Sequence, residues 1–214
     1  MNLIIMGAPG AGKGTQAEII SARENIPAIS TGQILRDAIA AGTELGIIAN
    51  SYINKGNLVP DEIVISIVRD YLKSEACANG FILDGFPRSI AQAEALEAMG
   101  VVIDAVLSID VSDERIVARM SGRRVCNKCG ASYHIDYKPS KVEGICDKCS
   151  SELSIRADDK AETVLIRLHN YHELTEPLLA FYSERKMLIR VEGQIEVEDT
   201  TRLVREALVE VGGR

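Results

Sequence analysis

The sequence predicts an α/β fold in which helices flank a five-stranded parallel sheet. Short apolar runs alternate along the chain with stretches of helical spacing, a pattern typical of parallel sheets. A glycine-rich turn follows the first apolar run, and two segments interrupt the alternation. With 46% hydrophobic residues, three Phe, six Tyr and no Trp, the core is expected to be aliphatic. The 214 residues suffice for one domain that carries small insertions.

The expected strands, in chain order, are residues 3–6, 28–30, 81–84, 105–111 and 188–191. The expected helices are residues 15–23, 61–72, 90–99, 113–120 and 204–211. The helix at 61–72 follows Pro60 and repeats Ile63, Ile67 and Tyr71 on one face, which is helical spacing. Pro177 is expected in the first turn of a helix or as a break in a longer one.

The stretch GAPGAGKGT at residues 7–15 fits the pattern G-x-x-x-x-G-K-[ST] and joins an expected strand to an expected helix. Its glycines let backbone N–H groups converge on phosphate oxygens, and the helix start adds its positive end. Lys13 is expected to reach the β- and γ-phosphates, and the Thr15 hydroxyl to bind Mg²⁺. The stretch therefore predicts a sheet of the P-loop NTPase type.

Two segments, residues 30–59 and 122–159, interrupt the alternation of strands and helices. The first is polar and contains Gly32, Gly42, Gly46 and Gly56. The second holds four cysteines and mixed charge, and it shows no helical period. Both are expected to be insertions in a core domain formed by residues 1–29, 60–121 and 160–214.

The four cysteines of the second insertion form two close pairs, Cys126 with Cys129 and Cys146 with Cys149. Two such knuckles complete a tetrahedron of thiolates around Zn²⁺. A segment with so few large apolar residues cannot build much core, so a structural metal would supply folding energy. Two disulfides or incidental thiols are the alternative interpretation, and iron or cobalt could replace zinc.

Several arginines follow expected strands or border the second insertion, where guanidinium groups could bind phosphate. They are Arg36, Arg88, Arg119, Arg123, Arg124, Arg156 and Arg167. Asp84 ends the expected strand at 81–84, where a carboxylate suits Mg²⁺ bound through its water shell. Asp158 and Asp159 are expected to hold a hinge or a closed state.

The net charge of −7 and the pI of about 5.1 argue against a general nucleic-acid or membrane surface role. No apolar run of 18 residues is present, so no transmembrane helix is expected. The phosphate loop begins so early that no signal peptide is expected either, which indicates a cytoplasmic location. A cytoplasmic protein keeps its thiols reduced, and this favours metal binding over disulfides.

Together these segments resemble the adenylate kinase family in its long form with a zinc-binding lid. The matching segments are GAPGAGKGTQA, ISTGQILR, GNLVPDEIV, GFILDGFPRS, SGRRVC and IRADDKAETV followed by RL. They occur in the family's order and cover nearly the whole chain. The resemblance implies a reversible phosphoryl transfer, from MgATP to AMP to give two ADP. It also implies that residues 122–159 form the zinc-binding lid and residues 30–59 an AMP-binding insertion, called the arm below.

The resemblance also implies a role for particular residues. The residues implied in ATP binding are Gly10, Ala11, Gly12, Lys13, Gly14, Thr15, Arg119, Arg123, Ser132, Tyr133 and Ile195. Those implied in AMP binding are Thr31, Arg36, Asn57, Leu58, Val59, Gly85, Phe86, Pro87, Arg88 and Gln92. Arg156 and Arg167 would contact both nucleotides, and the implied catalytic residues are Lys13, Arg88, Arg123, Arg156 and Arg167.

Two positions depart from the family's usual pattern. Gln33 stands where many members have an Asp of the magnesium–water network, and Ile34 stands where Met is common. A kinase for another nucleoside monophosphate, or one that uses GTP as donor, remains an alternative. So does a zinc-ribbon nucleic-acid-binding module joined to an ATPase fold. The expected partners are ATP, AMP and ADP, with no nucleic acid and no membrane, and the chain is expected to act as a monomer.

Overall fold

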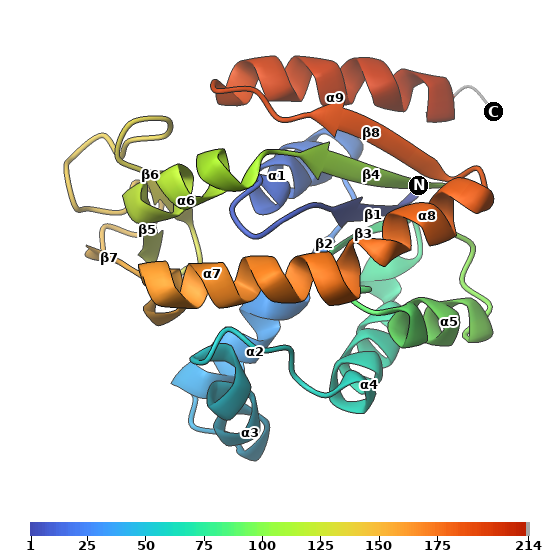
Figure 1. The fold of residues 1–214 in the computed structure, drawn as a ribbon, viewed down its shortest axis with the longest axis horizontal. Helices are drawn as coiled ribbons and strands as arrows, with labels where there is room; N and C mark the ends of the chain where they lie inside the picture. The colour runs from blue at the N-terminus through green and yellow to red at the C-terminus, as the bar shows by residue number, and fades with distance from the viewer. Residues whose placement is uncertain (213–214) are drawn as a thin grey trace.

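The computed structural model describes residues 1–212 and confirms the predicted α/β class. Its main sheet consists of β1 (Asn2–Met6), β2 (Ala28–Ser30), β3 (Phe81–Asp84), β4 (Ala105–Asp110) and β8 (Leu188–Glu192). The strands lie in the order β2-β3-β1-β4-β8, and every neighbouring pair is parallel. Each of the expected apolar runs is therefore a strand of this sheet, and all five end at the same edge (Figure 1).

Alternation along the strands explains why the sheet is buried on both faces. In β1, Leu3 and Ile5 belong to one hydrophobic cluster while Ile4 and Met6 belong to the other. The buried side chains are mainly Ile, Leu, Val and Ala, as the low aromatic content predicts. A two-sided core of this kind gives the loops at the carboxyl edge a rigid support.

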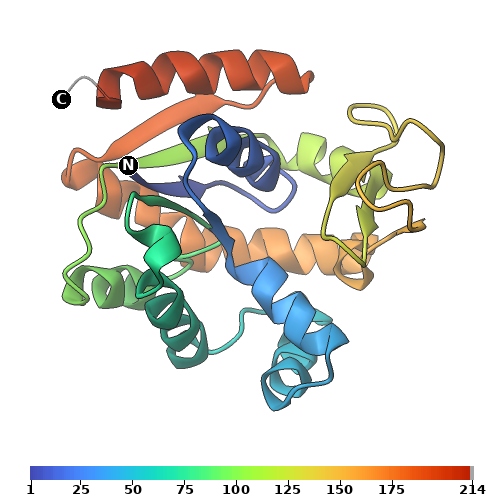
Figure 2. The ribbon, with the colours of Figure 1, turned by 180° about the vertical axis from the view of Figure 1, so that it is seen from behind.

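Helices pack on both faces of the sheet, as Figures 1 and 2 show from opposite sides. The helices are α1 (Lys13–Glu24), α4 (Asp61–Leu72), α5 (Ile90–Ala98), α6 (Asp113–Gly122) and α9 (Val197–Gly212), with a short 3₁₀ turn η1 (Glu75–Cys77). Helix α9 begins at Val197, well before the predicted 204, because its first turn is polar and shows no apolar period. Its acidic residues Glu198 and Asp199 suit the positive end of a helix.

Residues 161–184 form a nearly continuous helical segment, in which α7 runs below the sheet in Figure 1 and α8 follows it at the right-hand side. It consists of α7 (Ala161–Asn170), a π-helical turn η3 (Tyr171–Thr175) and α8 (Pro177–Glu184). Pro177 lies in the first turn of α8, one of its two predicted positions. Just before it, the Glu176 N–H donates to the Tyr171 carbonyl, 2.8 Å away, which is the spacing of a π-helix.

The arm contains two helices that the sequence did not predict, α2 (Thr31–Ala40) and α3 (Glu44–Ile53). They pack so closely that a Cβ at Gly46 would collide with the Ala38 carbonyl. The Thr43 hydroxyl caps α3 by accepting from the Gly46 N–H at 3.1 Å. These two helices are stabilised by packing against each other and by a cap rather than by a long apolar face. The hydrophobic periodicity of the arm sequence is therefore weak.

The lid is a small antiparallel sheet built from β5 (Arg123–Cys126), β6 (Ser132–His134) and β7 (Leu153–Ser154), and it ends at the 3₁₀ turn η2 (Ala157–Asp159). Its buried cluster is limited to Cys126, Ala131, Tyr133 and Cys146. The lid contacts α1 through Glu18, which pairs with Lys148 and lies 3.7 Å from the Lys138 ammonium. Among residues 1–212, no helix is long and apolar enough to cross a membrane.

Candidate functional site

The candidate site lies at the carboxyl edge of the sheet, where such folds bind ligands. The loop after β1 leads into α1 through Gly12, whose φ of 103° is left-handed and favours glycine. Lys13 begins the helix, and its ammonium donates to the carbonyls of Gly7 at 2.7 Å and Ala8 at 2.8 Å. A lysine ammonium has three N–H donors, so one remains for a ligand.

The Lys13 ammonium lies in an environment that disfavours its charge. Burial is the main cause, and it lowers the pKa of Lys13 to about 7. Asp84 opposes the shift, whereas Arg88, Arg167 and Arg123 add to it. A polyanion at this position would favour the charged form of the lysine and reverse the shift.

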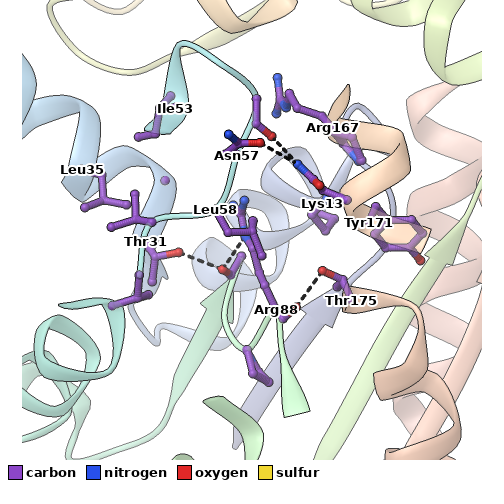
Figure 3. A pocket seen from close by; sticks show the side chains of 18 of the residues that line it. Lys13, Thr31, Leu35, Ile53, Asn57, Leu58, Arg88, Arg167, Tyr171 and Thr175 are labelled. Atoms are coloured by element: carbon purple, nitrogen blue, oxygen red, sulfur yellow. Dashed lines mark hydrogen bonds between the residues drawn. The ribbon is translucent and has the colours of Figure 1, made fainter. Parts of the chain in front are cut away.

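One pocket extends from the phosphate loop toward the arm and is shown in Figure 3. Of the residues implied in AMP binding, those that line it are Thr31, Arg36, Asn57, Leu58, Val59, Gly85, Pro87, Arg88 and Gln92. The Gly85 carbonyl accepts from the Thr31 hydroxyl at 2.9 Å and from Arg88 Nε at 2.8 Å. The Arg88 carbonyl accepts from the Thr175 hydroxyl at 2.9 Å. These contacts fix the backbone and the guanidinium of Arg88 at one end of the pocket.

A short chain of hydrogen bonds holds Gln92 in the wall of this pocket. Gln92 Oε1 accepts from the Arg88 N–H at 2.8 Å, and its Nε2 donates to Asp61 Oδ1 at 2.6 Å. Asp61 Oδ2 also accepts from the Ser89 hydroxyl at 2.7 Å. The amide orientation is therefore fixed, because a carboxylate can only accept and an N–H can only donate. One N–H and one lone pair of the Gln92 amide remain for a base.

Phe86 differs from the other residues of this group. The whole residue is 1% exposed, and its side chain packs in the core rather than lining the pocket. Phe86 is therefore the one residue of this group that does not line this pocket. The peptide bond between Phe86 and Pro87 is cis.

A second pocket lies between the phosphate loop and the lid. The residues implied in ATP binding all line it: Gly10, Ala11, Gly12, Lys13, Gly14, Thr15, Arg119, Arg123, Ser132, Tyr133 and Ile195. Arg119 donates to the Gln194 carbonyl, and the Gln194 N–H donates to Thr200 Oγ1 at 2.9 Å. The loop before α9 is thereby held against α6. Ile195 on this loop is 61% exposed, so its side chain and backbone are accessible at the pocket mouth.

The two pockets share a wall formed by Lys13, Arg36, Arg88 and Arg167. Arg123 and Arg156 line the second pocket beside it. Burial is the main cause that lowers the pKa of Arg36 to about 10 and that of Arg156 to about 9; neighbouring arginines add to the shift, and Asp158 opposes it. The sequence predicted these arginines as phosphate ligands, and the structure brings them together. Arg124 instead donates to the Ser121 and Arg123 carbonyls.

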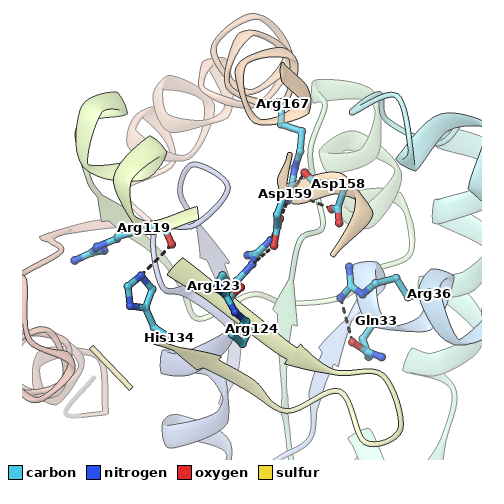
Figure 4. Close-up of polar contacts among 9 residues, drawn as sticks. All are labelled: Gln33, Arg36, Arg119, Arg123, Arg124, His134, Asp158, Asp159 and Arg167. Atoms are coloured by element: carbon cyan, nitrogen blue, oxygen red, sulfur yellow. Dashed lines mark hydrogen bonds and ion pairs between the residues drawn. The ribbon is translucent and has the colours of Figure 1, made fainter. Parts of the chain in front are cut away.

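Two buried carboxylates partly neutralise this cationic wall (Figure 4). Asp159 pairs with Arg123 and lies 3.0 Å from Arg167 Nη1, which is 2.9 Å from Asp158 Oδ2. Burial opposes the charge of Asp158, but Arg167, Arg123, Arg156 and Arg36 hold its pKa below the usual value. Cations still outnumber carboxylates in the wall, which therefore favours an anion of several charges.

Thr15 and Asp84 both line the second pocket beside the phosphate loop. Asp84 ends β3, and its Oδ2 accepts from the Ser30 hydroxyl at 3.1 Å. The residue between Lys13 and Thr15 is glycine, and a Cβ there would lie only 3.6 Å from Asp84 Oδ2. A carboxylate and a hydroxyl are oxygen ligands of the kind that Mg²⁺ prefers.

The four lid cysteines form a cluster whose sulfur atoms all lie within 4.8 Å of one another. Cys126 and Cys149 Sγ are 3.3 Å apart, and Cys129 and Cys146 Sγ are 3.5 Å apart. Zinc–sulfur bonds of about 2.3 Å place tetrahedral sulfurs about 3.8 Å apart, so the cluster fits a single ion. None of the four is in a disulfide. His134 is not part of the cluster, because its ring bonds the Arg119 carbonyl and the N–H groups of Asp136 and Tyr137.

Several residues that support the site are not predicted by the sequence. Asp61 accepts hydrogen bonds from both Ser89 and Gln92. In the sequence, its position after Pro60 predicts only the start of a helix. Its place in the quoted segment GNLVPDEIV was the available signal. Asn170 donates to the Gly56 carbonyl at 3.0 Å and so ties α7 to the arm. Nothing local marks Asn170 or the pair of Glu18 and Lys148, because their partners are distant in sequence.

Comparisons with known proteins agree with this geometry. The family model described as adenylate kinase matches residues 5–187. An adenylate kinase of Caldicellulosiruptor bescii is 57% identical over 212 residues, which cover 97% of this chain and 99% of the relative. An adenylate kinase of Acetivibrio thermocellus is 55% identical over 212 residues, with 97% and 98% covered. One from Archaeoglobus fulgidus is 50% identical over 214 residues, covering 98% of each chain.

Proposed function

The chain belongs to the adenylate kinase family, and we propose that its two joined pockets place the γ-phosphate of MgATP against the phosphate of AMP. It is an enzyme that transfers a phosphoryl group between nucleotides, with ATP, AMP and ADP as substrates and Mg²⁺ accompanying ATP. Other acceptors, a GTP donor and a nucleic-acid-binding module are not favoured, because relatives matching nearly the whole chain are named adenylate kinase. The reaction is reversible and converts MgATP and AMP into two ADP.

The pocket next to the lid is the proposed donor site. The phosphate loop, from Gly10 to Thr15, would bind the ATP phosphates through its N–H groups, with Lys13 at the β- and γ-phosphates. Thr15 and, through water, Asp84 would hold the Mg²⁺ ion, which supplies charge neutralisation at these phosphates. Arg119, Ser132, Tyr133 and Ile195 line the part of the pocket proposed for adenosine.

The pocket next to the arm is the proposed acceptor site. Arg36 and Arg88 would bind the AMP phosphate, while Thr31, Asn57 to Val59, and Gly85 to Pro87 would surround the nucleoside. Gln92 would bind the base, since its fixed amide still offers one donor and one acceptor. An amide with both functions matches adenine, which presents an amine beside a ring nitrogen.

The wall shared by the two pockets is the observation that carries this proposal. Lys13, Arg88, Arg123, Arg156 and Arg167 surround the junction, where the phosphoryl group would pass from donor to acceptor. Phosphoryl transfer requires little covalent chemistry from a protein, so alignment and cationic stabilisation supply the rate. Residues of the lid line the donor pocket, and closure of the lid over ATP would exclude water and bring Arg123 and Arg156 to the phosphates.

The lid and its cysteines have a structural role in this proposal. Cys126, Cys129, Cys146 and Cys149 would bind Zn²⁺ with no coordination position left for substrate. We propose the division expected from the sequence: a core of residues 1–29, 60–121 and 160–214, the arm at 30–59 and the lid at 122–159. We also propose the cytoplasmic location expected from the sequence, where thiols stay reduced and available to a metal.

We also propose that the chain acts as a monomer that does not bind nucleic acid. The residues that line both pockets come from one chain, so neither site needs a second copy. The net charge of −7 disfavours binding to a polyanion such as a nucleic acid, and the arginines assigned to phosphate binding lie in the pockets.

A coupled assay of ADP formation tests the proposed substrates. Each of several nucleoside monophosphates is paired with each of several nucleoside triphosphates. We expect the highest kcat/KM for AMP as acceptor and ATP as donor. A higher kcat/KM for UMP or GMP would overturn the role of Gln92, and a higher kcat/KM for GTP would overturn the donor assignment.

A further inference from the structure

Gln33 lies on α2 of the arm and lines the pocket next to the lid. Many members of the family have an acid at this position. Gln33 Oε1 accepts from Arg36 Nη2 at 3.1 Å, as Figure 4 shows, and its Nε2 donates to Asp37 Oδ1 at 2.7 Å. A guanidinium can only donate and a carboxylate can only accept, so these two partners fix the orientation of the amide. Gln33 is therefore built into α2 as a bridge between two charged side chains.

The lid contacts this same amide. Gly130 follows the first pair of metal-binding cysteines, and its φ of 74° is left-handed. A Cβ at Gly130 would lie 3.1 Å from Gln33 Cδ and 3.3 Å from both Nε2 and Oε1. Any larger residue would push the amide away, so glycine allows the turn of the lid to rest on Gln33. The cysteine-bearing turn and the arm thus meet at one side chain.

Arg36 depends on this bridge for its orientation. Within residues 1–212, Gln33 Oε1 is the hydrogen-bond partner that the structure gives to the Arg36 guanidinium. Arg123, Arg167 and Arg88 repel Arg36, while Asp158 attracts it. A guanidinium among like charges turns toward solvent or a carboxylate unless an acceptor holds it. The Gln33 carbonyl is that acceptor, and it keeps Arg36 in the wall shared by the pockets.

We propose that Gln33 is a positioning residue that couples closure of the lid to the affinity for AMP. When the lid rests on Gln33, the amide is confined between Gly130 and α2, and Arg36 is held toward the acceptor phosphate. This inference depends on the proposed function, because it takes Arg36 as a ligand of the AMP phosphate. Gln33 would therefore act by orienting Arg36, and not by binding the water molecules around Mg²⁺.

The test compares Gln33→Leu, which removes both hydrogen bonds, with Gln33→Glu, which keeps an acceptor for Arg36. Arg36→Ala and the double variant complete the cycle, and exposed Asn50→Leu on the neighbouring helix is the control. KM for AMP is measured at limiting and at saturating MgATP, together with kcat and the Mg²⁺ dependence. We expect Gln33→Leu to raise KM for AMP about 10-fold, the loss of one charge-assisted hydrogen bond. In Gln33→Leu the KM for ATP should change little. In Gln33→Glu the KM for AMP should stay close to the wild-type value. The decrease in KM for AMP between limiting and saturating MgATP should be smaller in Gln33→Leu than in the wild type.

The outcomes separate this inference from the proposed function. If Arg36→Ala raises KM for AMP and Gln33→Leu does not, the positioning role is wrong and the acceptor site stands. If Arg36→Ala leaves KM for AMP unchanged, the proposed acceptor site is itself wrong. A Gln33→Leu effect that adds fully to that of Arg36→Ala, or one confined to the Mg²⁺ dependence, would show that Gln33 does not act through Arg36.

Discussion

Arg123 and Asp159 form a bidentate ion pair in which both carboxylate oxygens accept from one guanidinium. Arg123 Nε lies 2.6 Å from Asp159 Oδ2. Arg123 begins β5 at the start of the lid, and Asp159 ends η2 at its close. The pair therefore joins the two ends of the lid at its base. It also aims Arg123 toward the phosphate pocket, because the carboxylate fixes the plane of the guanidinium.

Replacing Asp159 by Asn should destabilise the protein by about 3 kcal/mol, because it leaves Arg123 buried without its ion-pair partner and Arg167 with Asp158 alone. The free energy of unfolding is measured by urea denaturation. Asp70→Asn is the matched control, since its pair with Lys73 is exposed and contributes little. Equal stability of the two variants would show that the ion pair does not hold the base of the lid.

ATP binding should take up a proton above pH 7. The pKa of Lys13 is about 7 in the free protein, mainly because of burial, so most of this lysine is neutral at pH 8. Bound phosphates raise the pKa, and the ammonium is recovered on binding. The affinity for ATP should therefore fall as the pH rises from 7. At pH 6 the lysine is already charged, so ATP binding causes little proton uptake.

Calorimetry of ATP binding in buffers of different ionisation enthalpy measures this proton uptake. At pH 8 the wild type should take up close to one proton more than Lys13→Met. Equal proton uptake by the two proteins would mean that Lys13 does not contact the phosphates of ATP.

Arg88→Ala should impair the use of AMP far more than that of ATP. The loss of a charge-assisted contact costs about 1.5–3 kcal/mol, so KM for AMP should rise by roughly 10-fold to more than 100-fold. Arg69→Ala on the exposed surface of α4 is the control. Steady-state kinetics with each substrate varied give the answer. A large rise in KM for ATP with an unchanged KM for AMP would mean that the two pockets have been exchanged.

Removal of the lid metal should loosen the lid before the core. Elemental analysis of the purified protein should find about one zinc per chain, as a four-thiolate site implies. Cys146→Ser should lose the metal and expose residues 122–159 to hydrogen exchange and proteolysis, while β1 and β4 stay protected. Cys77→Ser, outside the cluster, is the control. Metal-free wild-type protein with an equally protected lid would contradict the structural role.

The sequence predicted the sheet well because each strand is a short apolar run that reflects burial on both faces. The phosphate loop and the cysteine pairs were predictable for a different reason, since their chemistry depends on local spacing. The arm helices α2 and α3 were not predictable, because they pack through small residues such as Gly46 and Ala38. Such residues produce little hydrophobic periodicity in the sequence. Asp61 gains its role from partners on another element, and Gln33 gains part of its role from Gly130 of the lid. Local spacing does not encode such contacts.

The most direct test of the central claim is a crystal structure with a bisubstrate analogue in which five phosphates join two adenosines. We expect one adenosine beside Arg119 and Ile195, and the other beside Gln92 and Leu58. The phosphate chain should cross the shared wall, within hydrogen-bond distance of Lys13, Arg88 and Arg167. A complex in which both adenosines occupy one pocket, or in which the phosphates bypass this wall, would show that the two pockets are not the donor and acceptor sites.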